Sequence, residues 1–267
     1  MSLDNTHLLK PRDIIENHSD SLAKMLQKTD KQTVFKKVIG LEQQKDLMIY
    51  SMKAIEPINY IIVGPPGNGK SLIIECVYEA FKEYSQWIDS TTSSGIGMIE
   101  RIIEKIDRLR FLCVDELEKF STSDRYTLLG LLGQGTLSRN LKHTSVEYTD
   151  LKIWFYATSN DIRKIQKQQP EFLDRCGVLE IPALPEETFY FVASKRLQKE
   201  EGIDNEAIAR YIAQRVYHDI RPGETNMRWT IRLAQLTYSY ARDNNTTVNK
   251  DSVDQVAGLV KNNIFML

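Results

Sequence analysis

Cysteine is scarce in this chain, and no pattern in the sequence would use it as a ligand or a crosslink. Only three of the 267 residues are cysteine, at Cys76, Cys113 and Cys176. They lie far apart and none belongs to a CxxC pair, which argues against a zinc site and against a disulfide framework. We therefore expect reduced thiols that are mostly buried.

Long apolar stretches are also missing. Aliphatic runs such as residues 61–63 fall far short of the roughly 20 residues that a helix needs to cross a bilayer. The segment Met1–Arg12 is polar and lacks the apolar centre of a secretory signal. We expect a cytoplasmic protein without a membrane span.

Neither sign of charge is in excess. The 35 Lys and Arg residues almost balance the 36 Asp and Glu residues, for a formal net charge of −1. A neutral surface has no global attraction to nucleic acid or to an anionic membrane. Any contact with nucleic acid must therefore come from a local basic patch.

Short apolar stretches alternate with helical ones from Val34 onward, which is the pattern of a parallel sheet covered by helices on both faces. Five strands are expected at Tyr60–Val63, Gln86–Asp89, Phe111–Val114, Ile153–Ala157 and Val178–Ile181. Beyond Pro182 and Pro185 only helices are expected, at Glu186–Glu200, Asn205–His218, Asn226–Asp243 and Asp251–Asn262. The domain boundary is predicted at this change of pattern.

A phosphate-binding loop follows the first expected strand and precedes an apolar-periodic helix. Its residues are Gly64, Pro65, Pro66, Gly67, Asn68, Gly69, Lys70 and Ser71. Glycines let the backbone N–H groups approach phosphate oxygens, and the helix adds its positive N-terminal end. Lys70 supplies a positive charge to the outer phosphates, and the Ser71 hydroxyl is a ligand for Mg²⁺. A glycine-rich turn capped by Ser71 is the structural alternative.

An acidic pair follows the third expected strand. Asp115 and Glu116 come directly after the apolar run 111–114, so they emerge at the carboxyl edge of the sheet. We predict that Asp115 completes the metal site and that Glu116 orients or deprotonates the attacking water. The alternative is an acidic pair that only caps the following helix.

Together these residues resemble the AAA+ ATPase family over roughly residues 34–262, most closely its Holliday-junction branch-migration motors (RuvB-type) and clamp loaders. The resemblance implies that Ile39 and Gly40 face the adenine, that Leu72 belongs to the nucleotide-binding set, and that Asn160 is sensor 1. It also implies that the strand before Asn160 lies between the strand before the P-loop and the strand before Asp115. Asn160 as a polar turn residue remains open.

Two arginines complete the resemblance. Arg175 stands where the family places an arginine finger that reaches the nucleotide of a neighbouring subunit, although Asp174 replaces the usual serine of clamp loaders. A surface pairing of Arg175 with an acidic neighbour is the alternative. Arg228 resembles sensor 2, with Arg221 and Arg232 as substitutes.

We accordingly predict a P-loop NTPase with a five-stranded parallel sheet between helices, followed by a small all-helical lid. The predicted parts are an N-terminal helical extension over 1–33 with a helix at 13–28, a nucleotide-binding α/β domain over 34–183, and the lid over 184–267. The resemblance implies ATP and Mg²⁺ as cofactors and subunits that assemble into a ring, with a hexamer as the expected number.

The substrate is less directly indicated. The loop 133–144 carries Arg139, Lys142 and His143, which favours DNA as a partner, although a solvated loop is an equal alternative. A pore-facing loop is expected near residues 91–98, and it lacks the aromatic residue of protein-threading relatives. DNA processing is therefore the first hypothesis. Protein remodelling is the second, an ATP-gated assembly switch with little turnover is the third, and a partner protein would supply targeting.

Overall fold

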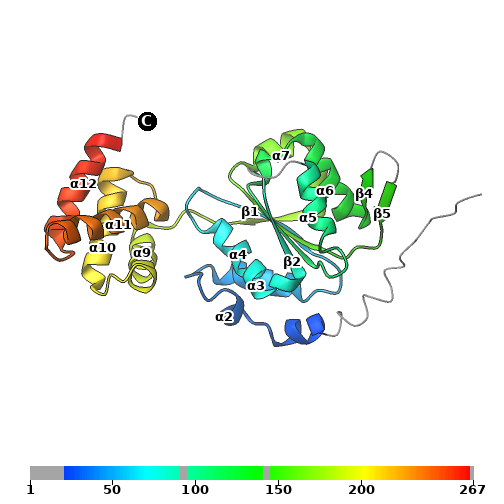
Figure 1. Cartoon of the computed structure of the whole chain (residues 1–267), viewed down its shortest axis with the longest axis horizontal. Coiled ribbons are helices and arrows are strands. Elements are labelled where there is room, and N and C mark those ends of the chain that lie inside the picture. The colour runs from blue at the N-terminus through cyan, green and yellow to red at the C-terminus, as the bar shows by residue number, and fades with distance from the viewer. Residues whose placement is uncertain (1–20, 91–94, 141–144, 265–267) are drawn as a thin grey trace, which may run out of the picture. The chain divides into compact units, whose positions relative to one another are not determined.

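The computed structural model describes residues 21–90, 95–140 and 145–264, which form two compact units (Figure 1). The first unit holds the chain up to Val63 and from Ser71 to Glu180. The second unit holds the chain from Ile181 onward together with the short stretch Gly64–Lys70. The phosphate loop thus belongs by its contacts to the helical unit, while the strand before it and nearly all of the helix after it belong to the first.

Five parallel strands form the sheet of the first unit, in the order β2-β3-β6-β1-β7. Their bounds are β1 Asn59–Val63, β2 Ser85–Asp89, β3 Phe111–Asp115, β6 Trp154–Ser159 and β7 Cys176–Glu180. Each predicted strand is present with its ends shifted by at most two residues. Strand β6 pairs with β1 on one side and with β3 on the other, so the predicted strand order is confirmed.

Helices cover both faces of this sheet, and the three central strands β1, β3 and β6 are accordingly buried along most of their length. Figure 1 shows α5, α6 and α7 on one side of the sheet and α3 and α4 on the other. On the first side, Ile61, Leu112 and Phe155 share a buried core with residues of α5 to α8. On the other side the Tyr156 hydroxyl lies 2.7 Å from the Ser51 hydroxyl of α3.

The helices of the first unit follow the predicted alternation. Their bounds are α2 Lys31–Val34, α3 Glu42–Met52, α4 Lys70–Ala80, α5 Gly95–Ile103, α6 Thr122–Gln134, α7 Ile162–Gln168 and α8 Glu171–Arg175, with 3₁₀ turns η1 Lys82–Tyr84 and η2 Leu117–Lys119. Residues 21–28 are also helical, whereas the rest of the helix expected at 13–28 lies outside the described residues. The described helices include none that is long and apolar enough to cross a membrane.

A strand takes up part of the basic loop expected at 133–144. Strand β4, Leu137–Asn140, pairs antiparallel with β5, Ser145–Tyr148. Arg139 lies in β4 opposite Val146, while Lys142 and His143 lie outside the described residues. The segment was expected to be a loop because its polar residues show no alternation of apolar and polar positions. The strands are stabilised instead by pairing with each other.

The expected pore-facing segment also needs a correction. Residues 91–94 lie outside the described part, but Met98 belongs to α5 and is fully buried in the core of the first unit. A methionine that fills the core under the sheet cannot also grip a polypeptide in a pore. The helical period of α5 explains this, because Met98 and Ile102 fall on its inner face.

The second unit contains four helices around their own core. They are α9 Glu186–Glu200, α10 Glu206–Arg215, α11 Met227–Asp243 and α12 Lys250–Ile264, with a π-helical turn η3 over Val216–Ile220. Leu197, Ile212, Leu233 and Val253 are fully buried where the helices meet. The α/β fold with a helical unit is therefore confirmed. The ends of these helices differ from the predicted ones by at most two residues, except at the end of α10, where the last turn widens into η3.

Candidate functional site

The phosphate loop follows β1 directly and leads into α4. Gly67 and Gly69 both have φ of 84°, a left-handed conformation that costs glycine nothing and other residues a good deal. A side chain at Gly69 would meet nothing within 4 Å, so its glycine serves the backbone conformation rather than packing. Successive N–H groups in such a loop form a concave surface that suits phosphate oxygens.

Lys70 is the first residue of α4 and is only 6% exposed. Its ammonium group donates hydrogen bonds of 2.8 Å to the carbonyl oxygens of Gly64 and Pro65. The charge is therefore held over the loop that it would serve. A buried ammonium needs such acceptors because an unpaired buried charge is costly.

Asn68 joins the phosphate loop to two later segments of the second unit, of which the loop is itself a part. The Thr225 hydroxyl donates to its side-chain oxygen at 3.2 Å, and its amide donates to the Pro182 carbonyl at 3.4 Å. Asn226, the N-cap of α11, lies so close that a Cβ built on Gly67 would be 3.5 Å from its side-chain oxygen. The beginning of α11 therefore lies beside the phosphate loop.

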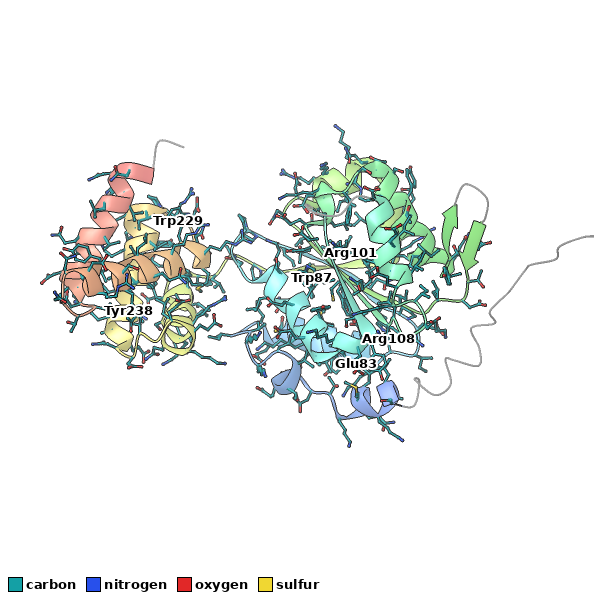
Figure 2. All side chains as sticks on the ribbon, in the orientation of Figure 1. Glu83, Trp87, Arg101, Arg108, Trp229 and Tyr238 are labelled. Carbon is teal, nitrogen blue, oxygen red and sulfur yellow. The ribbon has the colours of Figure 1, made fainter. Side chains whose placement is uncertain are left out.

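Arg228 is the second residue of α11 and is exposed. The two arginines named as its substitutes both lie against a tryptophan ring. The guanidinium groups of Arg221 and Arg232 lie 5.6 and 5.2 Å from the ring centre of Trp229, at distances typical of cation–π contacts (Trp229 is labelled in Figure 2). Arg228 has no such ring contact among the described residues, and its role as sensor 2 stays a prediction.

The acidic pair lies at the carboxyl end of β3, as expected. Asp115 accepts two hydrogen bonds on the same oxygen, from the Ser71 hydroxyl at 2.9 Å and from the Thr158 hydroxyl at 2.5 Å. Ser71 comes from α4 and Thr158 from β6, so three elements meet at one carboxylate. The two predicted metal ligands, Ser71 and Asp115, are in direct contact.

Glu116 follows in a strained backbone conformation, with φ of 56° and ψ of 51°. Non-glycine residues adopt this region rarely, and such strain gathers at functional sites. The Glu116 N–H donates to the Thr158 hydroxyl at 2.9 Å, which stabilises the turn. Its carboxylate accepts from Lys119 at 2.6 Å and from the Asn160 amide at 3.5 Å. The hydrogen bond to Glu116 raises the pKa of Lys119.

Asn160 follows β6 and is exposed. Because its side-chain amide lies 3.5 Å from a carboxylate oxygen of Glu116, the structure brings the predicted sensor 1 residue to the predicted base. Its stronger contacts are with a different carboxylate. Both its backbone N–H and its side-chain amide donate to one oxygen of Glu118, each at 3.1 Å. Glu118 itself is buried in η2.

Arg175 ends α8 and is exposed as a whole residue. Its guanidinium nevertheless lies on the last turns of α6 in the same subunit, where it donates to the Leu129 carbonyl at 2.5 Å. Gly133 makes room for it, because a Cβ there would lie 2.5 Å from the central guanidinium carbon. Neither Asp174 nor Glu171 forms an ion pair with Arg175 among the described contacts. The surface pairing considered from the sequence is therefore not observed in this part of the chain.

The other predicted nucleotide-binding residues lie around these elements. Ile39 and Gly40 precede α3, and Gly40 and Leu41 both have left-handed backbone conformations. The Gln44 amide of α3 donates to the Glu180 carbonyl at the end of β7, which ties this segment to the sheet edge. Leu72 lies in the first turn of α4 and is partly buried. Pro65 and Pro66 are exposed in the loop.

The donor set suits a magnesium–phosphate ligand better than a metal held by protein alone. Among the described residues no group of three or more His, Cys, Asp or Glu side chains is placed to hold a metal ion. Asp115 and the Ser71 hydroxyl supply hard oxygen atoms, and Mg²⁺ typically takes one or two protein ligands together with phosphates and water. ATP and Mg²⁺ fit the residues present.

Three residues of this cluster were not assigned a role from the sequence: Thr158, Glu118 and Lys119. Thr158 lies near the end of β6 and Asn160 comes directly after it. The polar run that follows the expected strand 153–157 was the only available signal for Thr158. Glu118 and Lys119 read equally well as the first turn of a helix. Their partners lie 42 residues or more away or across a turn, so no local pattern marks them.

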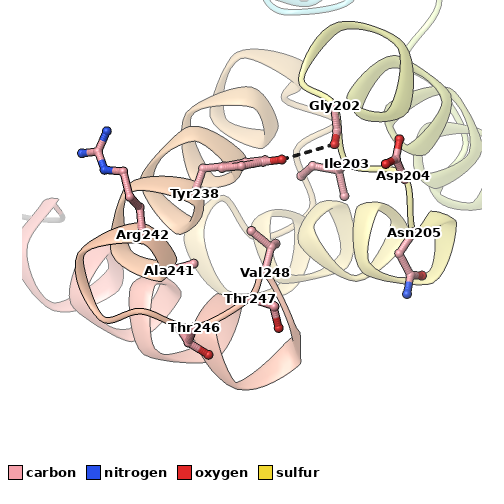
Figure 3. A pocket seen from close by; sticks show the side chains of 10 residues that line it. All are labelled: Gly202, Ile203, Asp204, Asn205, Tyr238, Ala241, Arg242, Thr246, Thr247 and Val248. Atoms are coloured by element: carbon pink, nitrogen blue, oxygen red, sulfur yellow. Dashed lines mark hydrogen bonds between the residues drawn. The ribbon is translucent and has the colours of Figure 1, made fainter.

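A separate pocket of about 380 Å³ opens in the second unit (Figure 3). It lies between the α9–α10 turn and the α11–α12 turn, where the Tyr238 hydroxyl donates to the Gly202 carbonyl at 3.4 Å. Arg242 on its rim pairs with Asp243. None of the predicted site residues lines it, so it is distinct from the phosphate loop.

The parallel sheet, the phosphate loop after β1, the acidic pair after β3 and the helical unit together define the fold of a P-loop NTPase with an additional helical domain. No protein-family model matches the sequence, and no curated protein is significantly similar to it.

Solved structures nevertheless share the fold. The RuvB Holliday junction branch migration motor of Thermotoga maritima is 17% identical, with a TM-score of 0.61 over 83% of this chain and 70% of that chain. Two point variants of the same RuvB are 16% identical, with a TM-score of 0.64 over 85% of this chain and 72% of theirs. The resemblance to RuvB-type AAA+ proteins is thus confirmed at the level of the fold.

Proposed function

We propose that this chain binds and hydrolyses ATP as a motor subunit of the AAA+ type. The observation that carries the proposal is the cluster around Asp115: one carboxylate joined to Ser71 and Thr158, with Glu116 next in the chain and within reach of Asn160. This is the set of groups that phosphoryl transfer to water requires at one place. A cluster that only capped a helix would not need the strained Glu116 backbone.

Each residue has a role in this proposal. The backbone of residues 64–69 and the Lys70 ammonium bind phosphate oxygens, while Ser71 and Asp115 hold Mg²⁺, which neutralises phosphate charge when bound. Glu116 accepts the proton of the attacking water, and Asn160 orients that water. Arg228 contacts the nucleotide from α11, and Ile39 and Gly40 lie against the base.

Assembly into a ring follows from Arg175. Arg175 is exposed as a whole residue at the end of α8, which supports a role toward a second copy of the chain; its guanidinium would have to leave the Leu129 carbonyl to act there. An arginine from a neighbouring subunit that contacts the γ-phosphate stabilises the charge of the transition state. Its removal lowers kcat by several orders of magnitude in NTPases that use one. We propose a homo-oligomeric ring, with a hexamer as the specific expectation.

DNA is the proposed substrate, and a cytoplasmic location is part of the same proposal. Two observations support it. The solved structures with this fold include a Holliday junction branch migration motor, and Met98, in the segment expected to face the pore, is buried and so cannot grip a polypeptide. A separate partner protein would supply targeting.

Turnover assays test both levels of the proposal. ATP hydrolysis by the wild-type chain should be stimulated by a four-way DNA junction and not by an unfolded protein. Lys70→Ala should abolish ATP binding in isothermal titration, because the loop loses its only described ammonium group. Stimulation by unfolded protein alone would move the assignment to protein remodelling. Intact affinity of Lys70→Ala for ATP would overturn the site itself.

Mixed rings test the role of Arg175. Arg175→Ala subunits and Lys70→Ala subunits should each be inactive alone, and mixing them should restore part of the activity. A mixed interface joins an intact phosphate loop to an intact arginine. No recovery on mixing would count against an arginine that acts across the interface.

A further inference from the structure

Glu118 is a buried carboxylate that the proposed chemistry does not use. It is 8% exposed, and its second carboxylate oxygen is buried without a hydrogen-bond partner among the described residues. Burying a carboxylate with an unused oxygen is costly, so an apolar residue in η2 would be the more stable choice. The position therefore needs a reason other than stability.

The reason lies in what Glu118 holds. One of its oxygens accepts from both the backbone N–H and the side-chain amide of Asn160, each at 3.1 Å. The same amide also reaches Glu116, at 3.5 Å. An amide between two carboxylates must turn its NH₂ group toward them, because a carboxylate only accepts. Asn160 thus spans Glu118 and Glu116 in one orientation, with its carbonyl oxygen directed elsewhere.

A second contact fixes Glu118 in turn. The Lys164 ammonium of α7 donates to the Glu118 carbonyl at 2.7 Å. The segment that follows β6 is therefore joined to η2 at two points, through Asn160 and through Lys164. Side chains that are held by such outer partners lose little freedom when they act, and removal of the partner typically lowers activity.

We infer that Glu118 is a positioning residue for ATP hydrolysis, which orients the Asn160 amide between itself and Glu116. This inference rests on the proposed hydrolytic function. In the proposed reaction Asn160 contacts the attacking water, and Glu118 acts only through Asn160. ATP binding does not depend on it, because the phosphate loop and Asp115 make no described contact with the Glu118 carboxylate.

The test compares turnover and affinity in matched variants. Glu118→Ala should lower kcat by about 10- to 100-fold, the usual effect of removing an outer hydrogen-bond partner, while the KM for ATP stays unchanged. Glu118→Gln keeps the shape and one acceptor, so it should fall between Glu118→Ala and the wild type. Glu83→Gln, on an exposed turn of the same unit, is the control and should leave kcat unchanged.

A double-mutant cycle separates positioning from mere structural support. If Glu118 acts through Asn160, then Glu118→Ala in an Asn160→Ala background should lower kcat no further. Additive losses in kcat, or an equal kcat for Glu118→Gln, Glu118→Ala and the wild type, would overturn the inference. Absence of hydrolysis by the wild type with intact ATP binding would instead refute the proposed function, so the two failures are distinguishable.

Discussion

Replacing Thr158 by valine tests the cluster around Asp115 most directly. Valine has the shape of threonine but neither donates nor accepts, so the change removes two hydrogen bonds from a side chain that is 2% exposed. Asp115 keeps its bond from Ser71 on the same oxygen. The Glu116 N–H loses the acceptor it has at 2.9 Å, in a left-handed turn that offers no other.

The size of the effect follows from these contacts. Leaving a buried donor unsatisfied costs about 1–3 kcal/mol, and loss of the hydrogen bond to a charged carboxylate adds about 1 kcal/mol where a second donor remains. We expect a loss of about 2–4 kcal/mol in the free energy of unfolding of the first unit. For a unit of this size the melting temperature should fall by roughly 5–10 °C.

Tryptophan fluorescence provides the assay. Trp87 and Trp154 lie in β2 and β6 of the first unit, and a Trp229→Phe background removes the third tryptophan, which lies in α11 (Trp87 and Trp229 are labelled in Figure 2). Thr237→Val is the control, measured by circular dichroism. Thr237 is also fully buried, but its hydroxyl only donates to the Leu233 carbonyl of its own helix.

The outcome for Thr158→Val has a clear point of refutation. A melting temperature within 1 °C of the wild type (about 0.5 kcal/mol or less) would show that neither hydrogen bond stabilises the site. A loss in Thr237→Val as large as that in Thr158→Val would attribute the effect to buried hydroxyls in general. In either case the cluster would not be the organised centre argued above.

Three further predictions follow from the same geometry. Glu116→Gln should bind ATP yet lose hydrolysis by two orders of magnitude or more, about the share of a general base, and full turnover would require another base. Gly133→Ala should push Arg175 off the Leu129 carbonyl and so release it for a neighbouring subunit. The protein concentration at which ATPase activity is half-maximal should then fall by a few-fold. Gly130→Ala, whose added methyl group makes only ordinary contacts, is the control and should leave that concentration unchanged. Burial raises the pKa of all three cysteine thiols, to about 11 for Cys76. At pH 8 the folded chain therefore contains almost no thiolate, and an aromatic disulfide reagent should label it very slowly. After unfolding, the same reagent should label three thiols. Rapid labelling of the folded chain would contradict that burial.

Local chemistry was readable from the sequence wherever the residues that act together are neighbours in the chain. The phosphate loop and the acidic pair each span eight residues or fewer, so glycine spacing, a following helix and a preceding apolar run were enough to identify them. The five strands and the four lid helices were likewise recognisable, because burial on both faces of a strand or one face of a helix leaves a periodic apolar pattern.

Pairing between distant segments could not be read in the same way. Strands β4 and β5 are short and mostly polar, so their sequence does not distinguish them from a loop, and only their mutual hydrogen bonds show that they are strands. The segment that contains Met98 was expected to face a pore, because a single apolar residue after a glycine-rich stretch does not show which side of its helix faces the core. The order of the sheet was expected only through a family resemblance, since apolar strands do not specify their neighbours.

The sequence by itself determined that a loop for phosphates and an acidic pair exist in this protein, because each is a contiguous run of residues with its own chemistry. Only the tertiary structure decided what surrounds them. By placing β6 beside β3, the fold puts Thr158 on Asp115 and Asn160 between Glu118 and Glu116, over sequence separations of more than 40 residues. Strand order is a property of the whole core, and hydrogen bonds across it are formed only once that core has closed.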